Sequence, residues 1–85
     1  MLLKEIVPAI MVAKIDAKRK HPYWPEQVPS QAGIVSAKAG ALQAAALKYK
    51  YNKAITSKEI EAQREKMKKA ALQCAAACIE FIENL

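Results

Sequence analysis

The placement of the prolines constrains this chain more than any other feature of its sequence. Three of the four prolines lie within residues 20–30, KHPYWPEQVPS. A proline pushes the residue before it out of the helical conformation, so a helix is not expected to run through a segment that holds three of them. We therefore predict a loop over residues 20–30, which separates an N-terminal element from the rest of the chain.

Before this loop, apolar residues recur at the three- and four-residue spacing of an amphipathic helix. The stripe predicts a helix over about residues 3–19 and consists of Leu3, Ile6, Ile10, Ala13 and Ala17. Pro8 interrupts the stripe, and a proline is harmless only in the first turn of a helix. Either the helix begins near Val7, or residues 2–7 form a turn before a kink. The sequence leaves both possibilities open.

Two further helices are expected after the loop. Ser30 is a candidate N-cap for a helix over about residues 31–51. The helix over about residues 57–84 has a clearer start, because Thr56 and Glu59 fit a capping box while Ile55 and Ile60 fit the hydrophobic staple that accompanies it. The apolar stripe of this last helix is Met67, Ala71, Cys74, Cys78, Phe81 and Leu85.

No segment alternates apolar and polar residues as a half-buried strand does, so the chain is predicted to be all-α. Its 85 residues make a single helical domain, 1–85, with three main helices. The two long helices are rich in alanine, which allows a close approach of helices but buries little apolar area. We expect a thin core and a bundle that is completed by homo-oligomerisation, as a dimer or a larger assembly.

The cysteines indicate the cellular compartment of the protein, and the net charge indicates the class of its partners. Cys74 and Cys78 lie four residues apart on one predicted helix, a spacing that does not readily permit a disulfide. With no signal peptide and no apolar run near the ~18 residues of a membrane span, we expect a cytoplasmic protein with two reduced, buried thiols and no membrane partner. The net charge of +6 favours anionic partners.

Groups that could carry enzymatic chemistry are sparse. His21 is the single histidine, and the sequence has neither a metal-spaced cluster nor a glycine-rich phosphate loop. The glutamates are expected on the polar flank of the third helix, where Glu65 would pair with Lys69, or at the C-terminus. No two carboxylates are therefore expected to face each other across the bundle, and we predict no metal and no cofactor.

Tyr23 and Trp24 form an aromatic pair within the proline-rich loop. They could pack against the end of the bundle as a plug. They could equally stack on a flat ligand such as a nucleobase, an interaction of about 1–3 kcal/mol per base. Sequence alone leaves both interpretations open.

Four stretches of the sequence form a distinctive combination: HPYWP at 21–25, IVSAKAGAL at 34–42, ALQCAA at 71–76 and FIENL at 81–85. Together they resemble small MazG-like proteins, often carried by phages, of the all-α nucleoside triphosphate pyrophosphohydrolase superfamily. The family motifs read HPxWP, VAEEAGEL and EAIQTAA…FLENL. The resemblance covers most of residues 20–85 and implies a MazG-like helical bundle.

The chain departs from this family at the positions that matter for catalysis. In the family, helix carboxylates hold the Mg²⁺ that clamps a nucleotide's phosphates. Here Ala37, Lys38, Ala41 and Ala70 stand where the pattern has glutamates, and Gln73 stands where many members keep an aspartate. The resemblance therefore implies a vestigial metal site and a pseudoenzyme. A lysine in such a site can meet phosphates directly in place of the ion.

We predict a non-catalytic MazG-like protein that binds a nucleotide or cyclic nucleotide and, if its gene is phage-borne, sequesters a nucleotide signal as an anti-defence sponge in the host cytoplasm. One alternative is a helical protein–protein interaction module whose vestigial site is packed shut by its alanines. A nucleic-acid binder, supported by charge alone, ranks below both. The predicted ligand-binding residues are His21, Tyr23, Trp24, Lys38, Lys69 and Gln73.

Overall fold

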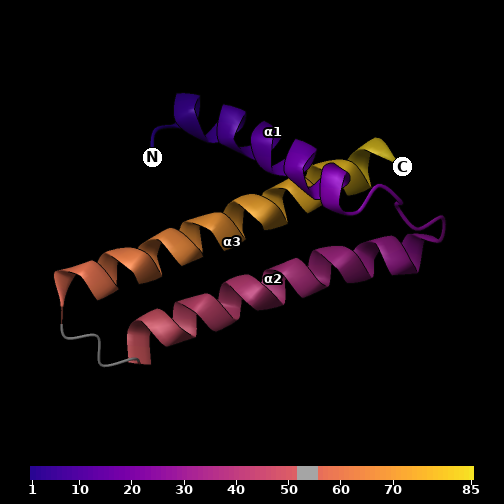
Figure 1. Cartoon of the computed structure of the whole chain (residues 1–85). Helices are drawn as coiled ribbons and strands as arrows, with labels where there is room; N and C mark the ends of the chain where they lie inside the picture. Colours follow the sequence, from indigo (N-terminus) through magenta and orange to yellow (C-terminus); the bar gives the residue numbers. More distant parts are fainter. Residues whose placement is uncertain (52–55) are drawn as a thin grey trace.

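The computed structural model describes residues 1–51 and 56–85. Helix α1 spans Leu3–Lys20, α2 spans Val28–Tyr51 and α3 spans Ser57–Glu83, and no strand occurs in the described residues. Figure 1 shows α3 between the other two helices. Residue contacts join α3 to α1 and to α2, whereas none joins α1 to α2 in this part of the chain. The predicted all-α fold with three helices is thus confirmed for the described residues.

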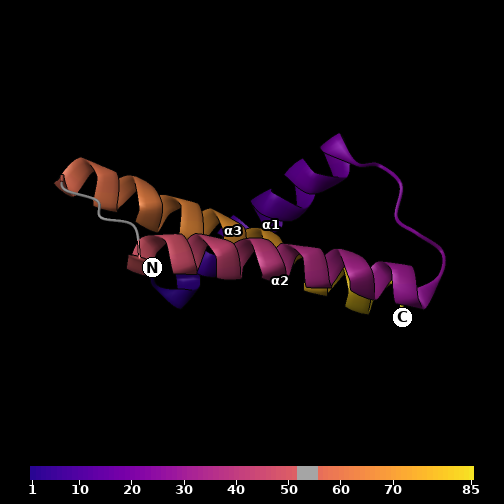
Figure 2. The same ribbon diagram turned by 90° about the horizontal axis from the view of Figure 1, so that it is seen from below.

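The three helices differ in direction, and the molecule is elongated as a result. Seen from below in Figure 2, α2 runs alongside α3 while α1 crosses both obliquely. The principal extents of the described molecule are 45 × 27 × 21 Å. Since α1 touches α3 but not α2, a space remains between α1 and α2, and residues of α3 and of the connecting loop border it.

Helix α1 begins at Leu3, in agreement with the predicted range of about residues 3–19. It continues through Pro8, so neither a start near Val7 nor a separate turn over residues 2–7 is what the structure has. The backbone amides of Glu5 and Ile6 donate to the carbonyl of Leu2 at 2.8 and 3.0 Å, which closes the first turn. Pro8 has no N–H and cannot bond the carbonyl of residue 4. That part of α1 is exposed, so water can reach the carbonyl instead.

Helix α2 begins at Val28, three residues before the expected start at Gln31. Ser30 therefore lies inside the first turn, and its expected role as N-cap is wrong. Pro29 does not block this earlier start, because first-turn amides have no acceptor within the helix and a proline there gives up no hydrogen bond. Since α1 extends to Lys20, the connecting loop is residues 21–27 and not 20–30.

Helix α3 begins where the sequence predicts. The hydroxyl of Thr56 accepts a hydrogen bond of 3.1 Å from the backbone amide of Glu59, as an N-cap does. The predicted staple partner Ile55 lies outside the described residues. At the other end, the side-chain amide of Asn84 donates to the carbonyl of Glu80 at 2.8 Å and closes the last turn.

The core is thin. Among the described residues, the buried apolar side chains are Ala76 and Ala77 of α3, at 3% and 8% exposure. Phe81 from the predicted stripe is half-buried, but Leu3 and Leu85 from the two stripes remain 74% and 76% exposed. None of the described helices combines the length and apolar character needed to cross a membrane.

An ion pair fastens α1 to the C-terminal part of α3. The ammonium nitrogen of Lys14 lies 3.8 Å from a carboxylate oxygen of Glu80 and also pairs with Glu83. The hydrogen bond to Glu83, partly opposed by desolvation, raises the pKa of Lys14 above the usual 10.5. This contact sets where the C-terminal half of α1 lies over α3, and hence the position of one wall of the site described next.

Candidate functional site

A cavity of about 920 Å³ lies between α1, the 21–27 loop, α2 and α3. Its wall on α3 is one continuous helix face, because the lining residues recur at spacings of three and four. They span residues 65 to 80, about 22 Å at 1.5 Å per residue. The face consists of Glu65, Lys68, Lys69, Leu72, Gln73, Ala76, Ala77 and Glu80. We call this space the central cavity.

All six residues predicted to bind a ligand line the central cavity. Three of them come from the loop after α1, one from α2 and two from α3, so the fold brings together positions that are far apart in the sequence. They are His21, Tyr23, Trp24, Lys38, Lys69 and Gln73.

The loop is anchored by Gln31, a residue to which the sequence analysis assigned no role. Gln31 is 4% exposed, and its side-chain amide donates to the carbonyls of Pro25 at 2.8 Å and Glu26 at 3.3 Å. These bonds tie the end of the loop to the first turns of α2, which places the neighbouring Trp24 against the cavity. The sequence offered one signal for this role, namely that Gln31 is a polar residue directly after the proline-rich loop. The burial of Gln31 could not be predicted from the sequence.

Trp24 and Tyr23 are adjacent in the sequence but differ in their exposure to solvent. Trp24 is half-buried, and its indole N–H is shielded from solvent without a hydrogen-bond partner in the described structure. Tyr23 is 91% exposed. Trp24 is thus a wall of the cavity, whereas Tyr23 stands at its edge with almost all of its ring free to contact something else.

Carboxylates also line the central cavity, although the sequence analysis expected the glutamates on the polar flank of the third helix or at the C-terminus. Asp16 of α1 lies in the same cavity as Glu65 and Glu80 of α3. Each of them is already bound to a lysine, so none adds unbalanced negative charge. The pairs are Asp16 with Lys20 at 3.5 Å, Glu65 with Lys68 at 2.9 Å, and Glu80 with Lys14 at 3.8 Å.

Once these ion pairs are taken into account, the lining of the central cavity has a net positive charge. Glu65 pairs with Lys68 and not with Lys69 as the sequence predicted, because the three-residue spacing also brings side chains together on a helix. Among the described residues, the lining lysines without a carboxylate partner are therefore Lys18, Lys38 and Lys69. Lys18 was not among the predicted residues. It reaches the site because it lies in the last turn of α1, which ends at Lys20 beside the loop.

The four positions of the predicted vestigial metal site differ in whether they line the central cavity. Ala37 and Lys38 line the central cavity, whereas Ala41 and Ala70 do not. Ala37 and Ala41 are exposed, so the packed-shut arrangement expected of an interaction module is not what the structure has. No group of three or more histidine, cysteine or acidic side chains in the described residues is placed to hold a metal ion.

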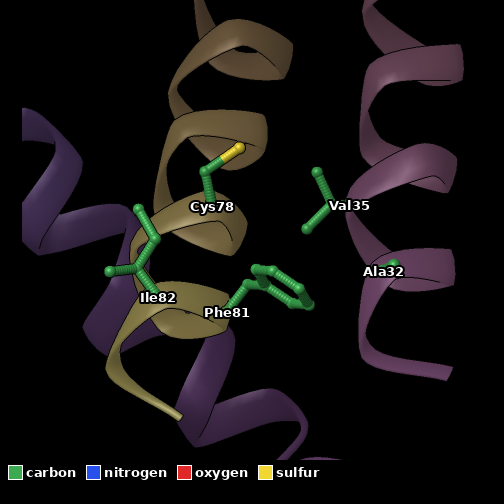
Figure 3. A pocket seen from close by; sticks show the side chains of 5 residues that line it. All are labelled: Ala32, Val35, Cys78, Phe81 and Ile82. Carbon is green, nitrogen blue, oxygen red and sulfur yellow. The ribbon is translucent and has the colours of Figure 1, made fainter. Parts of the chain in front are cut away.

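A second, smaller hollow of about 260 Å³ lies at the other side of the α2–α3 pair. It is lined by Ala32, Val35, Cys78, Phe81 and Ile82, which we call the C-terminal apolar face. Figure 3 shows Phe81 extending from α3 toward α2, with Cys78 one turn away and Ile82 turned to the side of α1. None of these side chains is charged.

The two cysteines of α3 are free thiols, in agreement with the expected lack of a bridge. Burial, with a smaller contribution from the neighbouring Cys78, raises the pKa of the Cys74 thiol above the usual 9.0. A raised pKa keeps this thiol protonated at neutral pH, and a protonated thiol is a poor nucleophile. Cys74 therefore acts as a small apolar side chain in the α3 stripe.

The chemical character of the central cavity follows from these contacts. Its floor is made of small and branched apolar side chains, one wall is an indole, and three lysines add positive charge that no described carboxylate balances. Such a site suits an anion that also carries a flat or apolar part. No family model matches the chain, and the comparisons with curated proteins and with solved structures find no similar protein either.

Proposed function

We propose that this protein is a non-catalytic, MazG-like pseudoenzyme that binds a nucleotide-type ligand in the central cavity. The observation that carries the proposal is that the adjacent aromatic residues Tyr23 and Trp24 line one cavity together with three lysines that have no carboxylate partner in the described part of the chain. A base and a phosphate group need these two kinds of contact at the same time.

The parts of the cavity suggest how a nucleotide would be held. Trp24 would stack on the base from the loop side, and Tyr23 would close over it, since its ring is almost wholly exposed. Lys38 and Lys69 come from α2 and α3 and would neutralise phosphates between them, with His21 beside them. Gln73, on the same face of α3 as Lys69, would offer an amide for polar recognition.

The absence of hydrolysis in this proposal rests on the metal-binding positions of the family that the chain resembles. A pyrophosphohydrolase of that family needs helix carboxylates to hold Mg²⁺, whereas the corresponding positions here are Ala37, Lys38, Ala41 and Ala70. No group of three or more acidic, histidine or cysteine side chains in the described residues could hold the ion instead. A protein that binds nucleotides without cleaving them removes them from solution. If the gene is phage-borne, this would make it a sponge for a nucleotide signal of the host.

A helical interaction module is the second candidate, and the shape of the cavity favours it. One face of α3 lines the cavity over about 22 Å, a length that would also accommodate four turns of an acidic amphipathic helix. The two candidates differ in what they predict for small ligands, because a groove for a helix has no reason to bind a free nucleotide.

Calorimetry with mononucleotides, cyclic nucleotides and dinucleotides tests the proposal. We expect at least one of them to bind, and Lys69→Ala to weaken that binding by about tenfold, the effect of losing ~1.4 kcal/mol from a charge-assisted contact. Lys66→Ala is the matched control, because Lys66 lies on α3 but does not line the cavity.

Two outcomes would contradict the proposal. If no nucleotide binds at low salt, the nucleotide site is wrong and the helix groove becomes the better candidate. If any nucleotide releases pyrophosphate in a Mg²⁺-dependent reaction that Glu65→Gln abolishes, the protein is an enzyme and the pseudoenzyme proposal fails.

A further inference from the structure

Helix α1 has an exposed row of large apolar side chains. Leu3, Val7, Met11 and Ile15 follow one another at four-residue spacing, so they form a band along one side of the helix. They are between 44% and 74% exposed, and none of them lines the central cavity or the C-terminal apolar face. In Figure 1, one side of α1 lies toward α3 and the other faces away from the molecule. We call this row of four residues the α1 ridge.

Exposed apolar side chains are concentrated at this end of the chain. Met1 and Leu2 precede the α1 ridge and are 56% and 60% exposed. Single exposed apolar side chains are ordinary on a protein surface. Six of them within 15 consecutive residues indicate a surface that contacts something else.

The charges of α1 are arranged around the ridge in a way that suits an anionic surface. At about 100° of rotation per residue, Glu5 and Asp16 lie on the side of the helix opposite the ridge. Lys4 lies beside the N-terminal end of the ridge, and Lys18 and Arg19 lie beside its C-terminal end. These three cations have no carboxylate partner in the described part of the chain. The ridge is therefore an apolar band with positive charge at both ends.

The shape of this surface fits a lipid bilayer better than it fits another helix. An amphipathic helix docks in a groove, and the α1 ridge borders neither of the two hollows. A bilayer needs no groove, because a basic amphipathic helix lies in its interface with the apolar face about 5–10 Å deep. Binding of this kind requires no spanning helix, whereas the expectation of no membrane partner considered spanning segments alone.

We propose that α1 binds the surface of an anionic lipid bilayer. The α1 ridge lies at the boundary between headgroups and acyl chains, and Lys4, Lys18 and Arg19 contact the anionic headgroups. The α1 residues Ala9, Val12 and Ala13, which line the central cavity, lie outside the ridge. The bilayer therefore leaves the nucleotide site open, and either proposal can fail without the other.

Flotation of the full chain with lipid vesicles tests the proposal. We expect vesicles of phosphatidylcholine with about 30% phosphatidylserine to bind at least about tenfold more protein than vesicles of phosphatidylcholine alone. Raising the salt from about 0.1 M to about 1 M should reduce this binding at least about fivefold, because the Debye length falls from ~10 Å to ~3 Å. Lys4→Gln/Arg19→Gln should reduce it in the same way at low salt, and neither residue lines the central cavity.

Ile15→Glu should weaken vesicle binding at least about tenfold, since it places a charge in the apolar band. Leu47→Glu is the matched control, because it adds the same charge at a 50% exposed position near the far end of α2. It should bind vesicles nearly as well as the wild type. Nucleotide affinity should be the same in Ile15→Glu and the wild type, which separates this proposal from that of the nucleotide site.

Ile15→Ala covers the case in which Ile15→Glu fails to fold. It should weaken vesicle binding by about threefold, while circular dichroism shows an unchanged helix content. Three results would overturn the proposal: no binding of the wild type to phosphatidylserine vesicles, equal effects of Ile15→Glu and Leu47→Glu, or a wild-type assembly that ignores vesicles and that Ile15→Glu dissociates. The last result would assign the α1 ridge to a contact between copies of the chain.

Discussion

The central cavity and the C-terminal apolar face share two helices, α2 and α3, and differ in charge, while α1 and the 21–27 loop complete the central cavity alone. Both draw residues from α2 and α3, and at the helical spacing of about 100° per residue they use opposite faces of α3. One contains Lys38 and Lys69, whereas the other contains no charged side chain. A pair of alanine-rich helices thus presents two hollows, and the few larger residues on each face decide which kind of partner it suits.

A double charge reversal in the central cavity should have the largest effect on nucleotide binding, because it removes the positive charge that distinguishes this cavity from the C-terminal apolar face. In Lys38→Glu/Lys69→Glu, two of the three lining lysines that have no carboxylate partner among the described residues become anions that repel phosphate. We expect nucleotide binding to fall by more than about 100-fold, since each charge-assisted contact contributes ~1.5–3 kcal/mol. Calorimetry measures the loss, and circular dichroism should show the helix content of the wild type. A loss of helix content in this variant would mean that the two substitutions act on folding rather than on binding.

Removing the indole should give the next largest effect. Trp24→Ala deletes a half-buried wall of the cavity, and a stacked base loses about 1–3 kcal/mol, or roughly 5- to 150-fold in affinity. Fluorescence or calorimetric titration with the best-binding nucleotide gives the ratio. If inorganic phosphate alone binds equally well to both proteins, then the effect is specific to the base. An equal loss for phosphate would instead indicate that the loop has moved.

Enlarging a buried alanine of the central cavity should have a milder effect, on stability. Ala76 is 3% exposed and lines the central cavity, so Ala76→Leu forces the helices apart and should cost about 1–3 kcal/mol of unfolding free energy. Urea unfolding at fixed chain concentration measures it. Ala71→Leu, at an exposed position of the same helix, should change stability little, and an equal cost at both positions would argue against close packing at Ala76.

The smallest expected effect is an alkaline loss of stability. The pKa of Cys74 is raised in the folded protein, above 9.0, because burial disfavours the thiolate. The folded state therefore holds this proton more tightly than the unfolded chain does. The resulting contribution of Cys74 to the free energy of unfolding is lost as the pH rises through 9 and above. The raised pKa of Lys14 acts in the same direction above 10.5.

Thermal melts between pH 7 and pH 11 measure this decline. Cys74→Ala should remove the part that begins near pH 9, and Glu83→Gln should weaken the part that depends on Lys14. A stability that increases over this range would contradict both assignments.

The local signals in the sequence were sufficient where a few neighbouring residues decide the structure. Thr56 and Glu59 predicted the start of α3 because an N-cap is formed within four residues of chain. The same reasoning failed for Ser30, because Val28 and Pro29 already satisfy the geometry of a first turn and the helix starts ahead of the polar residue.

The apolar stripes were less informative because alanine gives little contrast. The periodicity predicted the facing sides of α1 and α3 in outline, yet the buried residues proved to be Ala76 and Ala77 rather than the large members of the stripe. The ion pairs of α3 could not be predicted uniquely from the sequence either, as Lys69 shows. Spacing allowed Glu65 to bind a lysine at either three or four residues' distance, and the structure selects Lys68.

By itself, the sequence determined an all-α chain of three helices, the proline-rich break after α1, the capped start of α3 and the excess of positive charge, since all of these depend on neighbouring residues or on composition. Only the tertiary structure decided that Trp24, Lys38 and Lys69 line one cavity, that Gln31 anchors the loop, and that the acidic residues of the cavity are already paired. The physical reason is that these contacts depend on how α1 and α2 are placed on α3, and the alanine-rich helix faces carry too little pattern to specify that placement locally.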